Sequence, residues 1–406
     1  MSAPTSTSAY FAEHALAHAQ TVGKNGRGSA TAAERQAAEY VKAQLSSIGY
    51  QDVKFQPFLG ERSLWLFIAM AFGLALVGHA AYWLLQKPLG AIPALLIAWL
   101  VFGLSGYLVW CKFTKDAYPL KQALPHAPSQ NVLTVISPAQ APLKKMVLVA
   151  HLDSHRAVFW FATDLMVKIF SPIAAACLFG IYLAIPVYGL AALTHWPLFT
   201  WLSLVLLVLH FIGWFTGVTA DLGQYSPGAN DNASAVGTVL ALGERIKAMP
   251  LANTEVWLAF TGCEETSGDG MLALLKEHGS TLKEALFLDF EMVGIGDRIS
   301  FLRQEGNMRP LTIPPDVDSF IKDVGQKYGL QFSHAPLVGA ATECSILWRR
   351  GYKAVCLLAH YQGTTIMPEW HRLTDTSDHL QVSSLELVHG LAWDILQSFD
   401  QRGLNL

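Results

Sequence analysis

The sequence KMVLVAHLDSH, residues 145–155, is the stretch around which the rest of the chain is organised. Its first six residues, one lysine and five apolar residues, predict a short buried strand. His151 and Asp153 follow this strand directly. In parallel sheets, ligands bind at the carboxyl ends of the strands. A second motif, GANDN at residues 228–232, contains Asp231, and a mostly apolar insertion separates the two motifs. Because imidazole and carboxylate groups bind divalent metal ions, the motifs predict one metal site that the insertion splits.

Four apolar stretches are long enough to cross about 30 Å of hydrocarbon as helices. They cover residues 64–85, 89–111, 169–193 and 197–220. Short turns at residues 86–88 and 194–196 join them in pairs, which predicts two transmembrane hairpins and a protein with four spans. Core hairpins of a soluble protein are the alternative, but unbroken apolar runs above about 18 residues argue against it. His79 and His210 lie inside the runs, and we expect each to hydrogen-bond a neighbouring helix.

The composition agrees with a membrane protein. Of 406 residues, 52% are hydrophobic and only 15% are charged, whereas soluble domains carry roughly 25% charged residues. The formal net charge of -3 gives no basic field, so we expect no nucleic-acid partner. The five cysteines form no CxxC pair and no disulfide framework. The first residues lack the cationic start and apolar core of a cleavable signal peptide, and none is expected.

The two hairpins suggest how the chain is divided. Because a hairpin returns the chain to the side that it left, the remaining segments lie on one side of the membrane. Residues 1–61, 113–164 and 221–406 would form one α/β domain of about 300 residues, and residues 62–112 and 165–220 the hairpins. Lysines and arginines crowd the domain-side ends of the helices, whereas the opposite turns contain one lysine. The positive-inside rule therefore places the domain in the cytoplasm.

Periodicity predicts a mostly parallel central sheet flanked by helices. Apolar or β-branched runs bounded by turn residues predict strands at residues 52–55, 131–136, 145–150, 255–260, 285–290 and 353–359. Helical spacing of apolar residues predicts helices at residues 31–48, 233–247 and 316–328. His151, Glu264, Glu265 and Glu291 stand at or just past strand ends, so we expect them at one edge of the sheet.

Six segments resemble the di-zinc aminopeptidase family, the zinc exopeptidases related to aminopeptidase Y, bacterial secreted aminopeptidases and glutamate carboxypeptidase II. In chain order they are VLVAHLDS (147–154), GANDNASAV (228–236), FTGCEETSGDG (260–270), LDFEMVG (288–294), TECSILWRRGYKAV (342–355) and HRLTDT (371–376). They follow the family's order and cover nearly all of the chain outside the hairpins. The resemblance implies the family's α/β fold of the phosphorylase/hydrolase-like type, here with four transmembrane helices inserted as two hairpins.

The resemblance also implies two zinc ions per chain and a set of ligands for them. These are His151 and Glu291 for the first ion, Glu265 and His371 for the second, and Asp231 as the bridge between both. The catalytic residues would be Glu264 and Asp153, of which Asp153 resembles the residue that orients the His151 ring. Asp375 resembles the carboxylate that supports the second site.

Several assignments have competitors in the sequence. The family most often has aspartate where this chain has Glu291, and Asp289, two residues earlier on the same strand face, is the other candidate. His155 is a rival ligand, although a spacing of four residues after a strand does not bring two rings together. Asp231 could instead cap the helix that follows it. Cys263 is expected to be a buried thiol rather than a soft ligand.

The reaction implied by the resemblance is that of a membrane-bound zinc-dependent exopeptidase. Most relatives with a full ligand set are aminopeptidases, which remove N-terminal residues from peptides through a zinc-bridging hydroxide, with the residue matching Glu264 as general base. A glutaminyl-cyclase-like enzyme with a single zinc is one alternative, and a catalytically silent membrane scaffold or receptor is another. The complete ligand set argues against both. The expected partners are a peptide substrate and the lipid bilayer.

The second hairpin ties the expected site to the membrane. About a dozen residues lead from Asp153 into the hairpin, and about ten lead from it to Asp231. At ~3.5 Å per residue, the site lies at most roughly 40 Å from the bilayer surface. We therefore hypothesise that the cleft opens toward the lipid headgroups and favours apolar or membrane-derived peptides.

Overall fold

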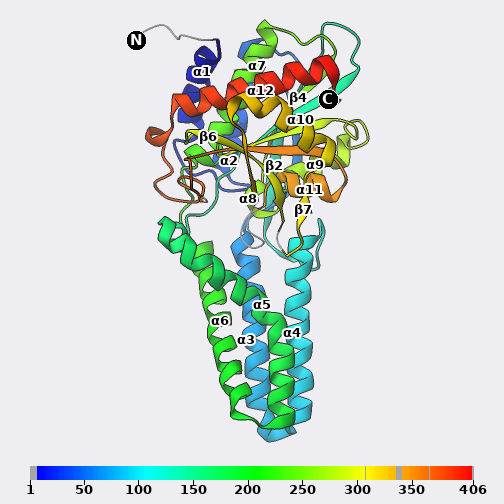
Figure 1. The fold of residues 1–406 in the computed structure, drawn as a ribbon. Helices are drawn as coiled ribbons and strands as arrows, with labels where there is room; N and C mark the ends of the chain where they lie inside the picture. Colours follow the sequence, from blue (N-terminus) through cyan, green and yellow to red (C-terminus); the bar gives the residue numbers. More distant parts are fainter. Residues whose placement is uncertain (1–6, 307, 335–340, 365, 405–406) are drawn as a thin grey trace.

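The computed structural model describes residues 7–306, 308–334, 341–364 and 366–404. Figure 1 shows an α/β domain from which long helices descend on one side. The central sheet of the domain is flanked by helices. The predicted fold class, α/β with a central sheet between helices, is therefore confirmed.

The strands of the described residues form one nine-stranded sheet, in the order β1-β2-β4-β3-β5-β9-β6-β7 with β8 beside β6. Their bounds are β1 (Lys54–Glu61), β2 (His126–Ile136), β3 (Lys144–His151), β4 (Thr254–Thr261), β5 (Leu286–Glu291), β6 (Arg298–Glu305), β7 (Leu311–Thr312), β8 (Gln331–His334) and β9 (Lys353–His360). The central strands β4, β3, β5 and β9 are parallel. Their carboxyl ends therefore meet at one edge of the sheet, which we call the carboxyl edge.

Helices cover both faces of this sheet. Their bounds are α1 (Thr7–Val22), α2 (Ala32–Ile48), α7 (Ser234–Ala248), α8 (Glu264–Ser267), α9 (Asp269–His278), α10 (Pro315–Gly325), α11 (Glu343–Arg349) and α12 (Val382–Arg402), with short turns η1 (Lys121–Ala123), η2 (Phe159–Phe161), η3 (Ala229–Ala233), η4 (Gln326–Tyr328) and η5 (Ser377–His379). The connections from β3 to β4 and from β4 to β5 step in opposite directions across the sheet. Right-handed crossovers therefore place α7 and α9 on opposite faces.

Each predicted strand and helix has a counterpart, but β1 ends six residues later and β2 begins five residues earlier than predicted. The sequence patterns did not predict β6, β7 and β8, nor the helices α1, α9, α11 and α12. The sheet is also less parallel than expected, because β1, β2, β6 and β7 each have an antiparallel neighbour.

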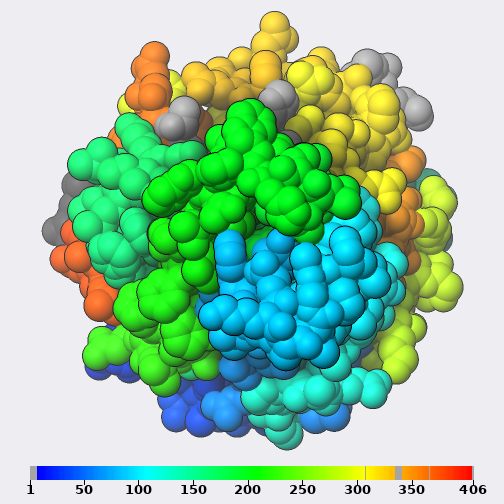
Figure 2. Space-filling model, turned by 90° about the horizontal axis from the view of Figure 1, so that it is seen from below, coloured from blue at the N-terminus to red at the C-terminus, as the bar shows by residue number. Residues whose placement is uncertain are grey.

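Four helices of the described residues are long and apolar enough to cross a membrane. They are α3 (Leu64–Leu89), α4 (Ala91–Thr114), α5 (Asp164–Thr194) and α6 (Pro197–Asp221). Seen from below, the α3–α4 hairpin in blue and cyan packs beside the α5–α6 hairpin in green (Figure 2). The first turn differs from the prediction: residues 86–88 belong to the end of α3, and Gly90 with a φ of 90° makes the turn. The division of the chain into domain and hairpins stays a prediction.

All four apolar helices join the domain at its carboxyl edge. The α3 helix begins three residues after the end of β1, and the β1 end pairs with the start of β2, beside the carboxyl end of β4. Ser63 caps α3 by accepting a hydrogen bond from Leu66 N, and its Oγ donates to the Asp221 carboxylate at the end of α6. The buried Lys112 Nζ of α4 lies 2.9 Å from Oε1 of Glu61, the last residue of β1.

The chain that enters the α5–α6 hairpin is hydrogen-bonded to the chain that leaves it. Ser226 N donates to His155 O at 2.9 Å, and Ala157 N donates to Gln224 O at 2.8 Å. Ser154 Oγ donates to Ser226 O at 2.8 Å. These bonds close the base of the insertion, so the residues on either side of it meet as if a short loop joined them.

A polar cluster links the two hairpins inside the apolar bundle. His79 of α3 lies with Nδ1 2.5 Å from Tyr188 Oη of α5 and with Nε2 2.8 Å from His210 Nδ1 of α6. All three side chains are buried. The expectation that each histidine hydrogen-bonds a neighbouring helix agrees with these contacts. We call this cluster the polar clasp.

Replacing His210 with leucine should loosen the bundle, because the buried His79 Nε2 would lose its partner. The expected loss is about 1–2 kcal/mol in the free energy of unfolding, seen as a lower Tm of the detergent-solubilised protein. Phe211→Leu is the matched control, since the neighbouring Phe211 side chain is half exposed on the outside of α6. Equal Tm values for both variants would contradict a stabilising role of the polar clasp.

Candidate metal centre

Three predicted site residues converge at the ends of β3 and β5 and in the loop before α7. His151 Nε2 lies 3.4 Å from Asp231 Oδ1 and 3.3 Å from Glu291 Oε2. All three side chains are buried. The structure therefore brings together the residues that the resemblance assigns to the first ion.

The other oxygen of Asp231 faces a second group. His371 Nε2 lies 3.4 Å from Asp231 Oδ2 and 3.4 Å from Glu265 Oε2. Glu265 belongs to the short helix α8 after β4, and His371 to the loop before η5. One carboxylate thus lies between two imidazoles and presents one oxygen to each, which is the arrangement that a bridging ligand requires.

These distances fit zinc better than they fit hydrogen bonds. Ligand atoms about 2.0–2.2 Å from a tetrahedral zinc ion lie about 3.3–3.6 Å from one another, whereas charge-assisted hydrogen bonds are shorter, about 2.7–2.9 Å. All four nitrogen–oxygen distances of the two groups fall between 3.3 and 3.4 Å. The donor atoms are nitrogen and carboxylate oxygen, the types that zinc takes in proteins.

An unsatisfied polar atom also points to a cation. Within the described part of the chain, the buried Oε1 of Glu265, a carboxylate of the second group, has no hydrogen-bond partner. Five carboxylates converge here: Asp153, Asp231, Glu264, Glu265 and Glu291. Because burying unpaired charge is costly, such a concentration of carboxylates favours bound cations. The residues present therefore fit one or two divalent ions.

Asp153 holds the turn that carries the two adjacent glutamates. Its Oδ1 accepts a hydrogen bond from Glu264 N at 3.1 Å, and its Oδ2 accepts one from Glu265 N at 3.2 Å. Ser29 Oγ donates to Oδ2 at 2.6 Å. Asp153 Oδ1 also lies 3.5 Å from His151 Nδ1. The position of Asp153 suits a residue that orients both the first imidazole and the glutamate turn.

The Glu264 carboxylate lies within 4.8 Å of ligand atoms of His151 and Glu265. Glu265 and Glu291 each lie within 3.4 Å of an imidazole nitrogen. Glu264 forms no such short contact with His151 or His371. Burial raises the pKa of Glu264 well above its usual range, and the carboxylates of Glu291 and Glu265 raise it further against the opposing effect of His151. A carboxylate with a raised pKa beside a metal centre suits proton transfer.

Hydrogen bonds fix the GANDN loop from several sides. Gly228, with a φ of 63°, begins the loop, and a Cβ there would lie 2.4 Å from Asp231 O. Asn232 Oδ1 accepts from Met292 N at 3.1 Å, which ties the loop to the end of β5. Asp375 accepts from Asn230 N at 2.7 Å and from Asp231 N at 3.0 Å. Asp375 therefore supports the bridging residue directly, and burial raises its pKa to about 7.

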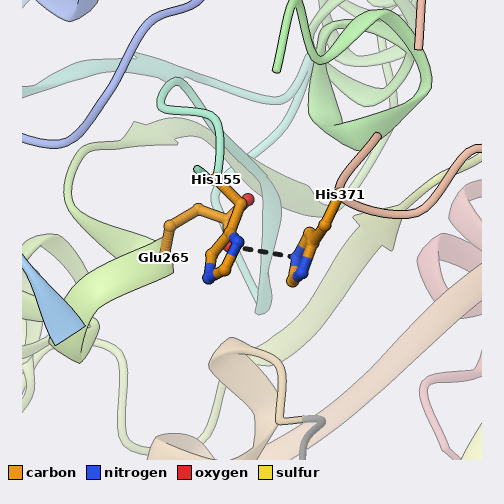
Figure 3. Close-up of side chains that lie close together, drawn as sticks. All are labelled: His155, Glu265 and His371. Atoms are coloured by element: carbon orange, nitrogen blue, oxygen red, sulfur yellow. Dashed lines mark ion pairs between the residues drawn. The ribbon is translucent and has the colours of Figure 1, made fainter. Parts of the chain in front are cut away.

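The rival ligand His155 lies against the second group. Its ring stacks on that of His371 with 3.7 Å between centroids and 13° between planes, as Figure 3 shows. His155 Nδ1 lies 2.8 Å from Arg156 O. A ligand atom of His155 also lies within 4.8 Å of those of Glu265 and His371. His155 thus belongs to the wall of the site, although the spacing after β3 gave no reason to expect it there.

The competitor Asp289 is fully buried and lies outside the two groups around Asp231. The structure brings Glu291 to His151 instead, and both Asp289 oxygens lack a hydrogen-bond partner among the described residues. Burial, and then the neighbouring Glu291 and Glu343, raise the pKa of Asp289 well above its usual range. Cys263 is buried, as expected, and forms part of the turn before Glu264.

Three residues from the first part of the chain support the site and were not predicted. Ser29 holds Asp153, and the buried Glu34 accepts hydrogen bonds from Cys263 N at 2.9 Å and Ser129 Oγ at 2.7 Å. Arg27 donates to Leu152 O at 2.8 Å and to the backbone before Asp231. The pattern T-x-x-E at residues 31–34 predicts a helix cap, but it gives no sign of the contact with the glutamate turn.

Comparison with protein families supports the metal centre. Residues 205–396 match the model of Peptidase family M28. This segment contains Asp231, Glu264, Glu265, Glu291 and His371. A search of the curated proteins found no match.

Solved structures share the fold at low sequence identity. A leucine aminopeptidase precursor from Bacteroides thetaiotaomicron is 13% identical with a TM-score of 0.54, over 95% of this chain and 96% of that one. A Zn-dependent exopeptidase from Parabacteroides distasonis is 12% identical with a TM-score of 0.54, over 95% and 97%. A glutaminyl cyclase from Bacteroides thetaiotaomicron is 14% identical with a TM-score of 0.55, over 95% and 97%.

At these identities the neighbours show the fold alone, whereas the family match covers most of the side chains around Asp231. Together with the six motifs, the match of residues 205–396 to the model of Peptidase family M28 supports a zinc exopeptidase family for this chain.

Proposed function

We propose that the protein is a membrane-bound aminopeptidase that uses two zinc ions. The observation that carries the proposal is the position of Asp231, whose two oxygens face the two imidazole groups at 3.4 Å each. A single-zinc enzyme needs only one such group. Here both groups contain an imidazole and a second carboxylate, so both can complete a site.

In the proposed reaction, a zinc pair held by the residues around Asp231 would supply an activated water and would stabilise negative charge on the scissile carbonyl. His151, Glu291, Glu265 and His371 would hold the ions, with Asp231 between them. Glu264 would take a proton from the water and return it to the leaving amine, because its carboxylate lies beside both groups. Asp153 would fix the orientation of Glu264 through its backbone N–H.

The membrane part of the proposal rests on the four apolar helices. We propose that they span the bilayer as two hairpins, with the catalytic domain on the cytoplasmic side. The positive charges at the domain-side ends support this orientation. The aminopeptidase assignment, rather than another exopeptidase activity, rests on the resemblance of the complete ligand set.

Zinc analysis tests the two-ion proposal. The purified protein should contain two zinc ions per chain, and Asp231→Asn should lose both, because each site would lose an anionic oxygen ligand. Elemental mass spectrometry gives the count, with Asp52→Asn as the control since Asp52 is largely exposed. One zinc ion in the unaltered protein would contradict the proposal and favour the glutaminyl-cyclase alternative.

Replacing Glu264 with glutamine should stop peptide hydrolysis and leave zinc bound, because the variant loses the proton acceptor but no proposed ligand. The expected loss of kcat is at least about a hundredfold, measured with a panel of aminoacyl-coumarin substrates. Glu39→Gln is the matched control on the exposed face of α2. A variant that retains activity would refute the role of Glu264. A zinc-loaded parent protein that cleaves no substrate would favour the scaffold alternative.

A further inference from the structure

An apolar surface leads from the second imidazole group toward the apolar helices. Trp160, Phe170, Ile366 and Trp370 are partly exposed and pack on one buried hydrophobic cluster. We call these four side chains the apolar shelf. At one end, the Trp370 ring lies 4.8 Å from the His371 ring. At the other end, Phe170 belongs to α5, and Trp160 Nε1 donates to Thr216 Oγ1 of α6 at 3.0 Å.

The buried cluster beneath the shelf is built by the segments that lead into the hairpins. It contains Trp65 at the start of α3 and Phe161 just before α5. The Phe161 ring lies 5.0 Å from the His371 ring, and the Trp65 ring lies 5.6 Å from the His155 ring. The wall of the metal centre and the base of the helices are therefore one packed unit.

The His371 loop is also attached to the start of the second hairpin. Arg372 Nε donates to Phe161 O at 2.9 Å, and the Arg372 guanidinium forms an ion pair with Asp164, the first residue of α5. These bonds hold the shelf beside His371 in a fixed position. A side chain next to the scissile bond would therefore meet a preformed apolar surface.

Further apolar side chains in the segments that lead into and out of the second hairpin are exposed. Phe159 is 61% exposed and Leu165 is 67% exposed, and Ile169 and Leu222 are also exposed. In Figure 1 the first part of α5 runs obliquely beneath the domain before the helix turns into the bundle. Exposed apolar side chains next to membrane-spanning helices are typical of a surface that meets lipid headgroups.

A small pocket of about 10 Å³ on the same side borders the metal centre. Arg62, Ser63 and Trp65 at the start of α3 line it together with His155 and Glu265. The pocket therefore lies at the base of the bundle, at the carboxyl edge of the sheet. The hypothesis that the site faces the headgroups agrees with this position.

We propose that the substrate is a peptide with an apolar N-terminal residue that lies on the bilayer surface, and that the apolar shelf binds this residue. The proposal rests on the di-zinc aminopeptidase function proposed above. The apolar shelf is continuous with the apolar helices, and this favours a membrane-bound peptide as the ligand. A peptide held at the headgroups reaches the shelf without crossing the aqueous phase. Burial of an apolar side chain on the shelf then favours leucine or phenylalanine over a polar residue.

The test uses the full-length protein in phosphatidylcholine nanodiscs and one short peptide in four forms. The N-terminal residue is leucine or serine, and the C-terminus is either free or carries a palmitoyl chain. We expect kcat/KM to be about tenfold or more higher for leucine than for serine. We also expect the palmitoylated leucine peptide to be cleaved faster than the free one, because anchoring raises its local concentration.

Shelf variants provide the second arm. Ile366→Ser and Phe170→Ser should each lower the leucine-to-serine ratio of kcat/KM by about tenfold while the zinc content stays unchanged. Leu143→Ser is the matched control, since Leu143 is 75% exposed and lies before the start of β3, away from the carboxyl edge.

The outcomes separate the two proposals. Equal rates for leucine and serine peptides, no gain from the palmitoyl chain, or shelf variants that behave like Leu143→Ser would overturn the proposed substrate, while hydrolysis itself would leave the aminopeptidase assignment standing. If the shelf variants behave like Leu143→Ser, the shelf contacts lipid but does not bind the substrate. A zinc-loaded protein that cleaves none of the four peptides would overturn the aminopeptidase function and this inference with it.

Discussion

The site depends on one carboxylate, that of Asp231, which must face two imidazoles at once. Its two oxygens lie 3.4 Å from His151 Nε2 and 3.4 Å from His371 Nε2. A small rotation of this side chain would improve one contact and lose the other. The loop around it is therefore held by the backbone hydrogen bonds to Asp375 and by the contact of Asn232 with the end of β5. These bonds fix the GANDN loop, the segment at Asp375 and the end of β5 around the Asp231 side chain.

The same constraint explains how a long apolar insertion can stand between His151 and Asp231. Hydrogen bonds between the segment at Ser154 and His155 and the segment at Ser226 close the base of the insertion. A short closed loop therefore joins the two ligands, and the long helices of the hairpin lie outside it. Loop-closure cost grows only slowly with length, so a folded hairpin that closes its own ends is a tolerable insertion at this position.

Local sequence patterns predicted what depends on local physics. The apolar run before His151 gave a strand end, and lengths of apolar sequence gave the four helices. Hydropathy marks where apolar residues stop rather than where helical hydrogen bonding stops, so residues 86–88 were assigned to a turn although they close α3. The contacts of Ser29 and Glu34 with the glutamate turn join residues far apart in the sequence. The stacking of His155 on His371 is of the same kind, and no periodicity encodes it.

The apolar helices join the domain at the carboxyl edge of the sheet, where the metal centre also lies. In an α/β sheet the ligand reaches the crevice beyond the carboxyl ends of the strands, and here the same edge carries Ser63, Lys112 and the start of α5. If the helices span a bilayer, its surface and the substrate share the space in front of the metal centre. A water-borne peptide must then enter between domain and headgroups, whereas a peptide already on the membrane enters along the surface. In that arrangement the insertion would change which molecules arrive at the site, while the residues around Asp231 would keep the geometry on which the proposed zinc binding depends.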